Sequence, residues 1–272
     1  MQPQEFEPPE ELRTTIKCFW YTSLDFGALP ASFEVLPDGY VEIIFHFGSV
    51  CSIATEEGLQ PLPSPFMVGL LKQPVHFHTT NRLQIMGVRC FPWAVFELLG
   101  LPPDKDGVRI FKHPLATLQP ALAELVQAGK LAEALAQVAE YFMQARLQNA
   151  SDSLPGKAGG VMQATNGTLP VSQVAAAAHA TVRTLERKFK QAAGHTVKDV
   201  SGLMRFEQVR NHLWLHPAAN LAGLAQELGY TDQAHLSREF KRYSGTTPAA
   251  FARKAKSEQR AASNDFVAFI QS

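Results

Sequence analysis

The chain has 272 residues, with 25 Lys+Arg balanced by 25 Asp+Glu, and 46% of its residues are hydrophobic. This composition is that of a globular protein long enough for two ordinary domains. No apolar run approaches the roughly 18 residues that a membrane helix needs, and the acidic, Pro-rich N-terminus does not resemble a secretory signal. These properties argue against a membrane partner and predict a cytoplasmic protein.

The cysteines Cys18, Cys51 and Cys90 are far apart, odd in number and outside any CxxC pattern. A disulfide framework is not expected from such spacing. We expect three reduced thiols that pack as small hydrophobic groups.

The zero net charge conceals a division. Residues 1–150 carry 10 Lys+Arg and 16 Asp+Glu, whereas residues 170–257 carry 13 Lys+Arg and 6 Asp+Glu. An acidic first part and a basic second part indicate two bodies with different partners. The basic part is a candidate for binding a polyanion such as nucleic acid.

Residues 33–99 have the pattern of β structure. Pro37-Asp38-Gly39 is a turn signal. In the stretch 41–47 after it, apolar residues at odd positions alternate with Glu42, Ile44 and His46, which is typical of a half-buried strand. Further strands are predicted at 66–71, 75–79 and 83–90.

Residues 115–147 change to a helical period. Leu118, Leu122 and Leu125 form one stripe, and a second stripe runs from Leu131 to Phe142, with Gly129 between the two. We expect two antiparallel helices that close off a β domain spanning residues 1–150.

Ser, Gly, Pro and Asn dominate residues 149–170, as in an exposed linker. We place the linker at residues 151–165, with at most one helical turn at 161–164. A second domain is expected at 166–257 and a C-terminal tail at 258–272.

Two segments of the second part repeat each other. LERKFKQAAGHTV (185–197) and LSREFKRYSGTTP (236–248) share six of thirteen residues at an offset of 51. An Ala/Leu-rich helix precedes each copy, at 171–179 and 221–229. Thr181, or Thr231-Asp232, caps each second helix and a glycine ends it. Two short helices joined by a tight turn predict a helix-turn-helix unit in each copy.

The second helix of each unit has one apolar and one outward face. At about 100° per residue, Arg183 and Arg187 both point away from Leu185, and Ala234 and Arg238 form the equivalent stripe. Outward Arg suits guanine edges, outward Ala suits a thymine methyl group, and flanking lysines suit phosphates. A basic helix face exposed only to solvent is the alternative interpretation, but two copies with matched cores favour DNA binding. The expected DNA-binding residues are Arg183, Thr184, Arg187, Lys188, Lys190, Gln233, Ala234, His235, Arg238 and Lys241.

Between the units, residues 198–217 show a helical pattern of apolar residues that ends at His216-Pro217. We expect a rigid linker helix that holds the two helix-turn-helix units about one helical turn of DNA apart.

This part of the chain resembles the AraC/XylS family of bacterial regulators over about residues 165–255. The second half, LGYTDQAHLSREFKRYSGTTPAAF, is close to the signature of the family. The resemblance implies a seven-helix, two-headed DNA-binding domain. It also implies base contacts from Arg183, Arg187, Ala234, His235 and Arg238.

The first half departs from the family pattern in two places. His179 stands where the family usually has Gly, at the turn between the helices. The helix before the first unit is poorly marked around Gly156–Gly160. The N-terminal stretches VLPDGYVEIIFHFG and MGVRCFPWAVFELLG are similar to a domain that precedes AraC-type domains in uncharacterised regulators. That similarity implies an effector-binding or dimerisation domain of cupin-like β-barrel type, and so an α+β chain of two domains.

Candidate effector-binding residues in the β domain are His46, His76, His78, Arg89 and Trp93. His76 and His78 share one face of a strand, where either a metal site or a plain polar surface is conceivable. Arg89 suits either an anionic effector or an ion pair. The aromatic residues line a pocket or fill a core, and the sequence does not separate these. The aromatic residues are Phe45, Phe47, Phe66, Phe77, Phe91, Trp93 and Phe96.

These patterns predict a transcription regulator that binds double-stranded DNA and responds to an unknown small molecule, and they make the chain a candidate for homodimer formation. They indicate no enzyme activity, cofactor or metal. Two alternatives stay open: a metal-responsive regulator, and a DNA-repair alkyl transferase that carries an AraC-type module and uses a reactive cysteine.

Overall fold

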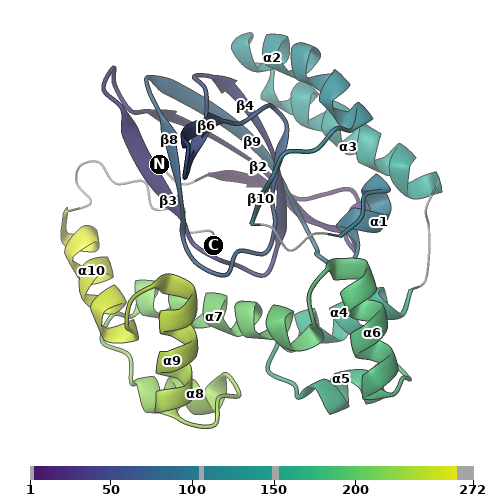
Figure 1. Cartoon of the computed structure of the whole chain (residues 1–272), viewed down its shortest axis with the longest axis vertical. Coiled ribbons are helices and arrows are strands. Elements are labelled where there is room, and N and C mark those ends of the chain that lie inside the picture. Colours follow the sequence, from purple (N-terminus) through teal and green to yellow (C-terminus); the bar gives the residue numbers. More distant parts are fainter. Residues whose placement is uncertain (1–2, 104–106, 149–152, 262–272) are drawn as a thin grey trace.

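The computed structural model describes residues 3–103, 107–148 and 153–261. It confirms an α+β chain of two parts, with a β-rich N-terminal domain above a helical C-terminal domain (Figure 1). In the described residues, the C-terminal part contains the seven helices that the family resemblance implies. No described helix combines the length and the apolar character that crossing a membrane requires.

Two antiparallel sheets form the β domain. The larger sheet has the order β1-β2-β9-β4-β7-β10 and the smaller has the order β3-β8-β5-β6. The strands of the larger sheet are β1 (Gln4–Phe6), β2 (Ile16–Asp25), β9 (Arg82–Cys90), β4 (Val41–Gly48), β7 (Phe66–Val68) and β10 (Val108–Arg109). Those of the smaller sheet are β3 (Ala31–Val35), β8 (Val75–Thr79), β5 (Ser52–Thr55) and β6 (Gly58–Pro61).

The central strand β4 is buried on both faces, which corrects the expectation of a half-buried strand. Ile43 and Phe45 belong to the core on the helical side, while Ile44 belongs to a second core between the two sheets. Glu42 is only 7% exposed. Both faces are covered because the smaller sheet lies on one side of the larger sheet and helices lie on the other.

Strands β1 and β2 lie outside the predicted β region and were missed. The middle of β2, from Cys18 to Tyr21, is a continuous apolar run without alternation, because residues on both faces of the strand are buried there. A continuous apolar run of this length does not distinguish a strand from a helix. Strand β2 nevertheless pairs with β9 along almost its whole length and contributes Trp20 to the space between the sheets.

The predicted helix pair is confirmed as α2 (Gln119–Gln127) and α3 (Leu131–Gln148), with Gly129 in the left-handed region between them. Short 3-10 turns at Glu10–Leu12 and Pro114–Leu118 and the helix α1 (Val95–Leu99) complete the N-terminal part.

Residues 154–164 form a helix, α4 (Leu154–Ala164), where the sequence predicts an exposed linker. Ser153 caps it by accepting a hydrogen bond from the Gly156 amide at 3.2 Å. Gly159 faces Trp93, and a Cβ placed there would lie 2.1 Å from the Trp93 ring. The glycines that suggested a linker therefore permit close packing of α4 against the N-terminal domain. Residues 151–152 lie outside the described residues.

The remaining helices are α5 (Val171–Ala177), α6 (Val182–Ala193), α7 (Val197–Leu215), α8 (Leu221–Glu227), α9 (Gln233–Ser244) and α10 (Pro248–Ala261). Helix α10 includes the first residues of the predicted tail, and residues 262–272 lie outside the described residues. One continuous core joins the larger sheet, helices α1 to α3 and the C-terminal helices.

Candidate DNA-binding face and interdomain cavity

Two helix-turn-helix units form as the repeat predicts. We call α5 with α6 head 1, and α8 with α9 head 2. In head 1, Thr181 Oγ1 accepts a hydrogen bond from the Thr184 amide at 3.2 Å. In head 2, Asp232 Oδ1 accepts one from the His235 amide at 2.6 Å. Gly194 and Gly245 end the second helices in the left-handed conformation. Both second helices are therefore defined at each end by local chemistry.

The second helices are strongly two-faced. Leu185 and Phe189 of α6, and Leu236 and Phe240 of α9, are at most 1% exposed. The other faces carry the residues expected to contact DNA. Those that are exposed are Arg183, Arg187, Lys188, Lys190, Gln233, Ala234, Arg238 and Lys241. Each head thus presents a basic helix face to solvent, as the helical spacing predicts.

Two of the expected DNA-binding residues are partly buried at the helix starts. Thr184 takes part in the cap of α6, where its hydroxyl lies 3.0 Å from Thr181 Oγ1. The His235 ring packs edge-on against Tyr230, and its Nδ1 lies 3.3 Å from Thr231 Oγ1. These contacts fix the His235 ring at the N-terminal end of α9.

The turns of the two heads match in conformation but not in length. His179 has φ 54° and Gly229 has φ 72°, so both occupy the left-handed region. The next amides bond equivalently, from Ala180 to the Ala175 carbonyl and from Tyr230 to the Ala225 carbonyl, each at 2.9 Å. Helix α6 then begins at residue 182 and α9 at residue 233, so the turn of head 2 is one residue longer. His179 therefore adopts the conformation for which the family uses Gly.

Helix α7 joins the heads and lies below the β domain (Figure 1). A reciprocal capping box of Thr196 and Asp199 starts this helix. The Arg205 guanidinium donates to the Gly167 carbonyl at 3.0 Å and to the Glu239 carboxylate at 3.1 Å and 3.2 Å. Arg205 thus connects α7, the loop that precedes head 1, and the recognition helix of head 2.

Head 1 also packs against the N-terminal domain. The Trp93 ring stacks on Phe91 with centroids 5.0 Å apart and contacts Phe189 of α6 at 6.1 Å. Trp93 is only 2% exposed. It is therefore a packing residue between the domains and does not line a ligand site, contrary to its place among the effector candidates.

The other candidate effector residues do not gather in one place. His76 is exposed and lies 3.6 Å from the Glu34 carboxylate on the outer face of the smaller sheet, where His78 also lies. His46 Nε2 lies 3.1 Å from the Leu62 carbonyl, and burial lowers the pKa of His46. Arg89 is buried in ion pairs with Glu42 at 2.7 Å and Glu5 at 3.3 Å. The predicted effector residues therefore do not come together in one site.

The geometry supports neither alternative function. Among the described residues, no group of three or more His, Cys, Asp or Glu is arranged to hold a metal ion. All three cysteines are buried, and burial raises the pKa of Cys18 and of Cys51 to about 12 and that of Cys90 well above its usual value. Alkyl transfer needs a thiolate, which this burial disfavours.

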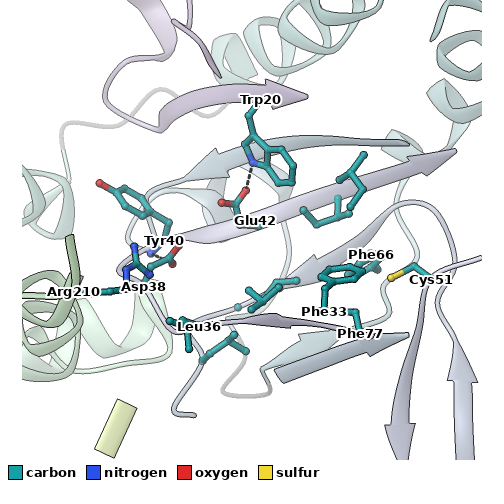
Figure 2. A pocket seen from close by; sticks show the side chains of 16 residues that line it. Trp20, Phe33, Leu36, Asp38, Tyr40, Glu42, Cys51, Phe66, Phe77 and Arg210 are labelled. Atoms are coloured by element: carbon teal, nitrogen blue, oxygen red, sulfur yellow. Dashed lines mark hydrogen bonds between the residues drawn. The ribbon is translucent and has the colours of Figure 1, made fainter. Parts of the chain in front are cut away.

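A cavity lies between the two sheets and reaches α7. It contains about 650 Å³ of space, its opening to solvent included, but only about 60 Å³ is wide enough for the centre of a water-sized group. Figure 2 shows Phe33, Phe66, Phe77 and Cys51 at one end and Asp38, Tyr40 and Arg210 at the other. Phe33 stacks on Phe77 at 5.6 Å. The cavity is therefore narrow, apolar at one end and charged at the other.

Sequence reasoning missed the charged end of this cavity. Asp38 was assigned only to a turn, and Glu42 to the polar face of a strand. Arg210 comes from α7, far away in the sequence. A single charge inside the apolar run of β4 was the available signal for Glu42. Only Phe66 and Phe77 of the candidate aromatic residues line the cavity.

Comparison with known proteins agrees with the division of the chain into a β-rich N-terminal domain and a helical C-terminal domain. A profile described as a domain of unknown function (DUF6597) matches residues 4–105, and a profile described as a helix-turn-helix domain matches residues 174–254. No curated protein matches the chain.

Several solved structures are similar to parts or most of the chain. ToxT from Vibrio cholerae O395 has 10% identity over 86% of this chain and 97% of its own, with a TM-score of 0.45. A structure of wild-type ToxT from Vibrio cholerae strain SCE256 with bound unsaturated fatty acid has the same identity and TM-score over 86% of this chain and 94% of its own. The DNA-binding domain of AdpA, in complex with a target DNA, has 22% identity over 40% of this chain and 98% of its own, with a TM-score of 0.36.

The two capped heads, their shared linker helix and the matching helix-turn-helix profile agree with one another. The chain carries a domain of unknown function (DUF6597) at its N-terminus and an AraC-type helix-turn-helix domain at its C-terminus.

Proposed function

We propose that this regulator reads a specific double-stranded DNA sequence with both heads and that a small molecule in the N-terminal domain controls it. The observation that carries the proposal is the matched pair of exposed basic helix faces on one rigid helix, α7. Two heads fixed on one helix are suited to successive major-groove segments.

In head 1, we propose that Arg183 and Arg187 read guanine edges, since both are exposed on the face opposite Leu185. Bidentate Arg contacts to guanine O6 and N7 discriminate by about 1–3 kcal/mol. Lys188 and Lys190 flank this face and suit phosphates, as does Thr184 at the N-terminus of the helix.

In head 2, Arg238 is the one exposed Arg at an outward position equivalent to Arg187. Ala234 occupies the position equivalent to Arg183 and suits a thymine methyl group. Gln233 and His235 lie in the first turn of α9, and Lys241 suits a phosphate. The heads therefore present different chemistry, and we expect them to read different sequences.

The effector would occupy the cavity between the sheets. The loop between β3 and β4 forms one wall of that cavity and also touches α7, where the Arg210 guanidinium donates to the Pro37 carbonyl at 3.4 Å. Gly39 of the same loop packs against Met204 of α7. A ligand that moves this loop therefore acts directly on the helix that joins the heads.

A DNA titration tests the proposal. We expect the full chain to bind its selected DNA sequence far more tightly than a random duplex. The logarithm of affinity should fall steeply with the logarithm of salt concentration, by about 0.9 per phosphate contact. Titrations to saturation also report the number of chains on each DNA site.

Two substitutions separate sequence reading from general charge. Arg238→Ala is expected to cost about 1–3 kcal/mol on the selected sequence and to relax preference at one base pair. Arg82→Ala removes the same charge from an exposed position of the β domain and should leave binding unchanged. Equal affinity for selected and random DNA would contradict sequence-specific reading.

A further inference from the structure

The charged end of the cavity has an excess of acidic groups. Among its lining residues, the carboxylates are Asp38 and Glu42 and the cation is Arg210. With every group ionised, one negative charge is left over. The hydrogen bonds and ion pairs of each charged group show which carboxylate carries this excess negative charge.

Glu42 is fully engaged by protein groups. Its Oε2 accepts the Trp20 indole N–H at 2.8 Å and its Oε1 accepts the Arg89 Nε–H at 2.7 Å. Arg89 also pairs with Glu5 at 3.3 Å. The charge of Glu42 is therefore compensated inside the β domain.

Arg210 is engaged in the same way by groups around α7. Its guanidinium donates to the Pro37 carbonyl and, at 3.3 Å, to the Asn211 side-chain oxygen, and it lies 3.8 Å from the Glu207 carboxylate. Arg210 is 2% exposed. Arg210 therefore lines the cavity, while the polar contacts of its guanidinium go to Pro37, Asn211 and Glu207.

Asp38 is different. Among the described residues, one hydrogen bond reaches its carboxylate, from the Tyr40 amide to Oδ1 at 3.0 Å. Asp38 lines the cavity beside Tyr40, as Figure 2 shows. Loss of hydration raises the pKa of Asp38 above its usual range, although Arg89 lowers it. A carboxylate in this setting gains most from a cation that arrives with the ligand.

The rest of the cavity suits a slender apolar body. Its walls are aliphatic and aromatic side chains from both sheets. Trp20, next to the acidic end, offers an aromatic ring that attracts a cation, whereas the Tyr40 ring already holds the Arg89 guanidinium, 5.5 Å from its centroid. The apolar end is closed by the stacked rings of Phe33 and Phe77.

We propose that this cavity binds an organic cation, a protonated amine on an apolar or aromatic body, with Asp38 as its counter-ion. Because Asp38 sits between Pro37 and Gly39, which both contact α7, the same contact transmits occupancy to the DNA-binding heads. This second step rests on the proposed function, whereas the binding of the cation does not.

Three probes with one body and different head groups test the binding step. We would titrate the full chain, without DNA, with phenylbutylamine, phenylbutanol and phenylbutyrate, following tryptophan fluorescence and binding heat. The amine is expected to bind at least about tenfold more tightly than the alcohol or the carboxylate, which corresponds to about 1.4 kcal/mol. Tightest binding by the carboxylate, or no binding by the amine, would overturn the proposal.

Two matched variants assign the effect to Asp38. Asp38→Asn keeps the Oδ1 acceptor for Tyr40 but removes the charge, and it should reduce the amine affinity to that of the alcohol. Asp25→Asn is the control, since Asp25 Oδ1 accepts the Gly27 amide at 2.9 Å in the same kind of local turn, at the exposed end of β2. An unchanged amine affinity in Asp38→Asn would contradict the assignment.

DNA affinity measured with and without saturating amine tests the transmission step. We expect a change in affinity for the selected sequence in the wild type and none in Asp38→Asn. Selective amine binding with unchanged DNA affinity would reject transmission but keep the cation site. Failure of the chain to prefer its selected DNA would reject the proposed function, and the probe titrations would stand apart from that result.

Discussion

The two heads have nearly the same helices and different surroundings. Phe189 of head 1 and Phe240 of head 2 occupy equivalent positions and are equally buried. Phe189 contacts Trp93 from the N-terminal domain. Phe240 contacts Phe206 of α7 and Phe251 of α10, at 5.1 Å and 5.4 Å, which both belong to the C-terminal domain.

This difference indicates that the two heads depend on different parts of the chain for their packing. Head 2 is supported wholly by its own domain and by the Arg205–Glu239 ion pair. Head 1 completes its core with a side chain from the N-terminal domain. A change in the N-terminal domain therefore reaches head 1 through its packing, and it reaches head 2 only by way of α7.

The largest expected effect comes from Trp93→Ala. Removing this ring leaves a large void between α4, α6 and the β domain, and we expect a loss of about 3–5 kcal/mol in the free energy of unfolding. Hydrogen exchange should increase in the backbone of α6 much more than in α9. Chemical denaturation and exchange measured by mass spectrometry provide the two readouts.

Phe251→Ala is the matched control for head 2. It removes an aromatic neighbour of Phe240 that comes from α10, so faster exchange should appear in α9 and not in α6. If Trp93→Ala raised exchange equally in both heads, the proposed difference in support would be wrong.

The second effect concerns Arg205, which fixes head 2 to the loop before head 1. Arg205→Met leaves the carboxylate of Glu239, whose side chain is only 15% exposed, without its cation. We expect a loss of about 2 kcal/mol in stability. Two-headed DNA should lose more affinity than DNA with one half-site, because the heads are no longer held at one separation.

The double variant Arg205→Met with Glu239→Gln tests the cause. Neutralising Glu239 removes the buried unpaired charge, so part of the lost stability should return, while the preference for two-headed DNA should not. A double variant no more stable than Arg205→Met alone would show that the contact of the Arg205 guanidinium with the Tyr230 ring, rather than the ion pair, carries the effect.

The sequence predicts the heads well because their helices are amphipathic, capped and ended by glycine within a few residues. It predicts strands poorly where both faces are buried, as in β2. It also mistakes the α4 glycines for a linker, since the reason for Gly159 is the ring of Trp93, which lies far away in the chain. Local sequence patterns predict local structure, but they do not reveal which residues are needed for close packing between segments far apart in the chain.

The cavity shows the same limit. Its charged end combines a turn residue, Asp38, a strand residue, Glu42, and Arg210 from another domain. No spacing in the sequence relates these three positions. The spacing of His76 and His78 did predict that they share one face of a strand. Alternation along a strand does not say which part of the protein packs against that face, and both residues lie on the outer face of the smaller sheet.

The smallest expected effect lies in the turns. His179 is exposed and holds a left-handed φ that costs a non-glycine residue about 1–2 kcal/mol, while glycine adds flexibility to the unfolded chain worth about 0.4–1 kcal/mol. His179→Gly should therefore raise stability by about 0.5 kcal/mol, measured by chemical denaturation.

Gly229→Ala should act in the opposite sense, since its φ is also left-handed and a Cβ there would lie 2.9 Å from the Thr168 carbonyl oxygen. The turn of head 2 is pressed against the loop before head 1, whereas that of head 1 is open to solvent. A stabilising Gly229→Ala, or a destabilising His179→Gly, would mean that the two turns are not under the constraints that their surroundings indicate.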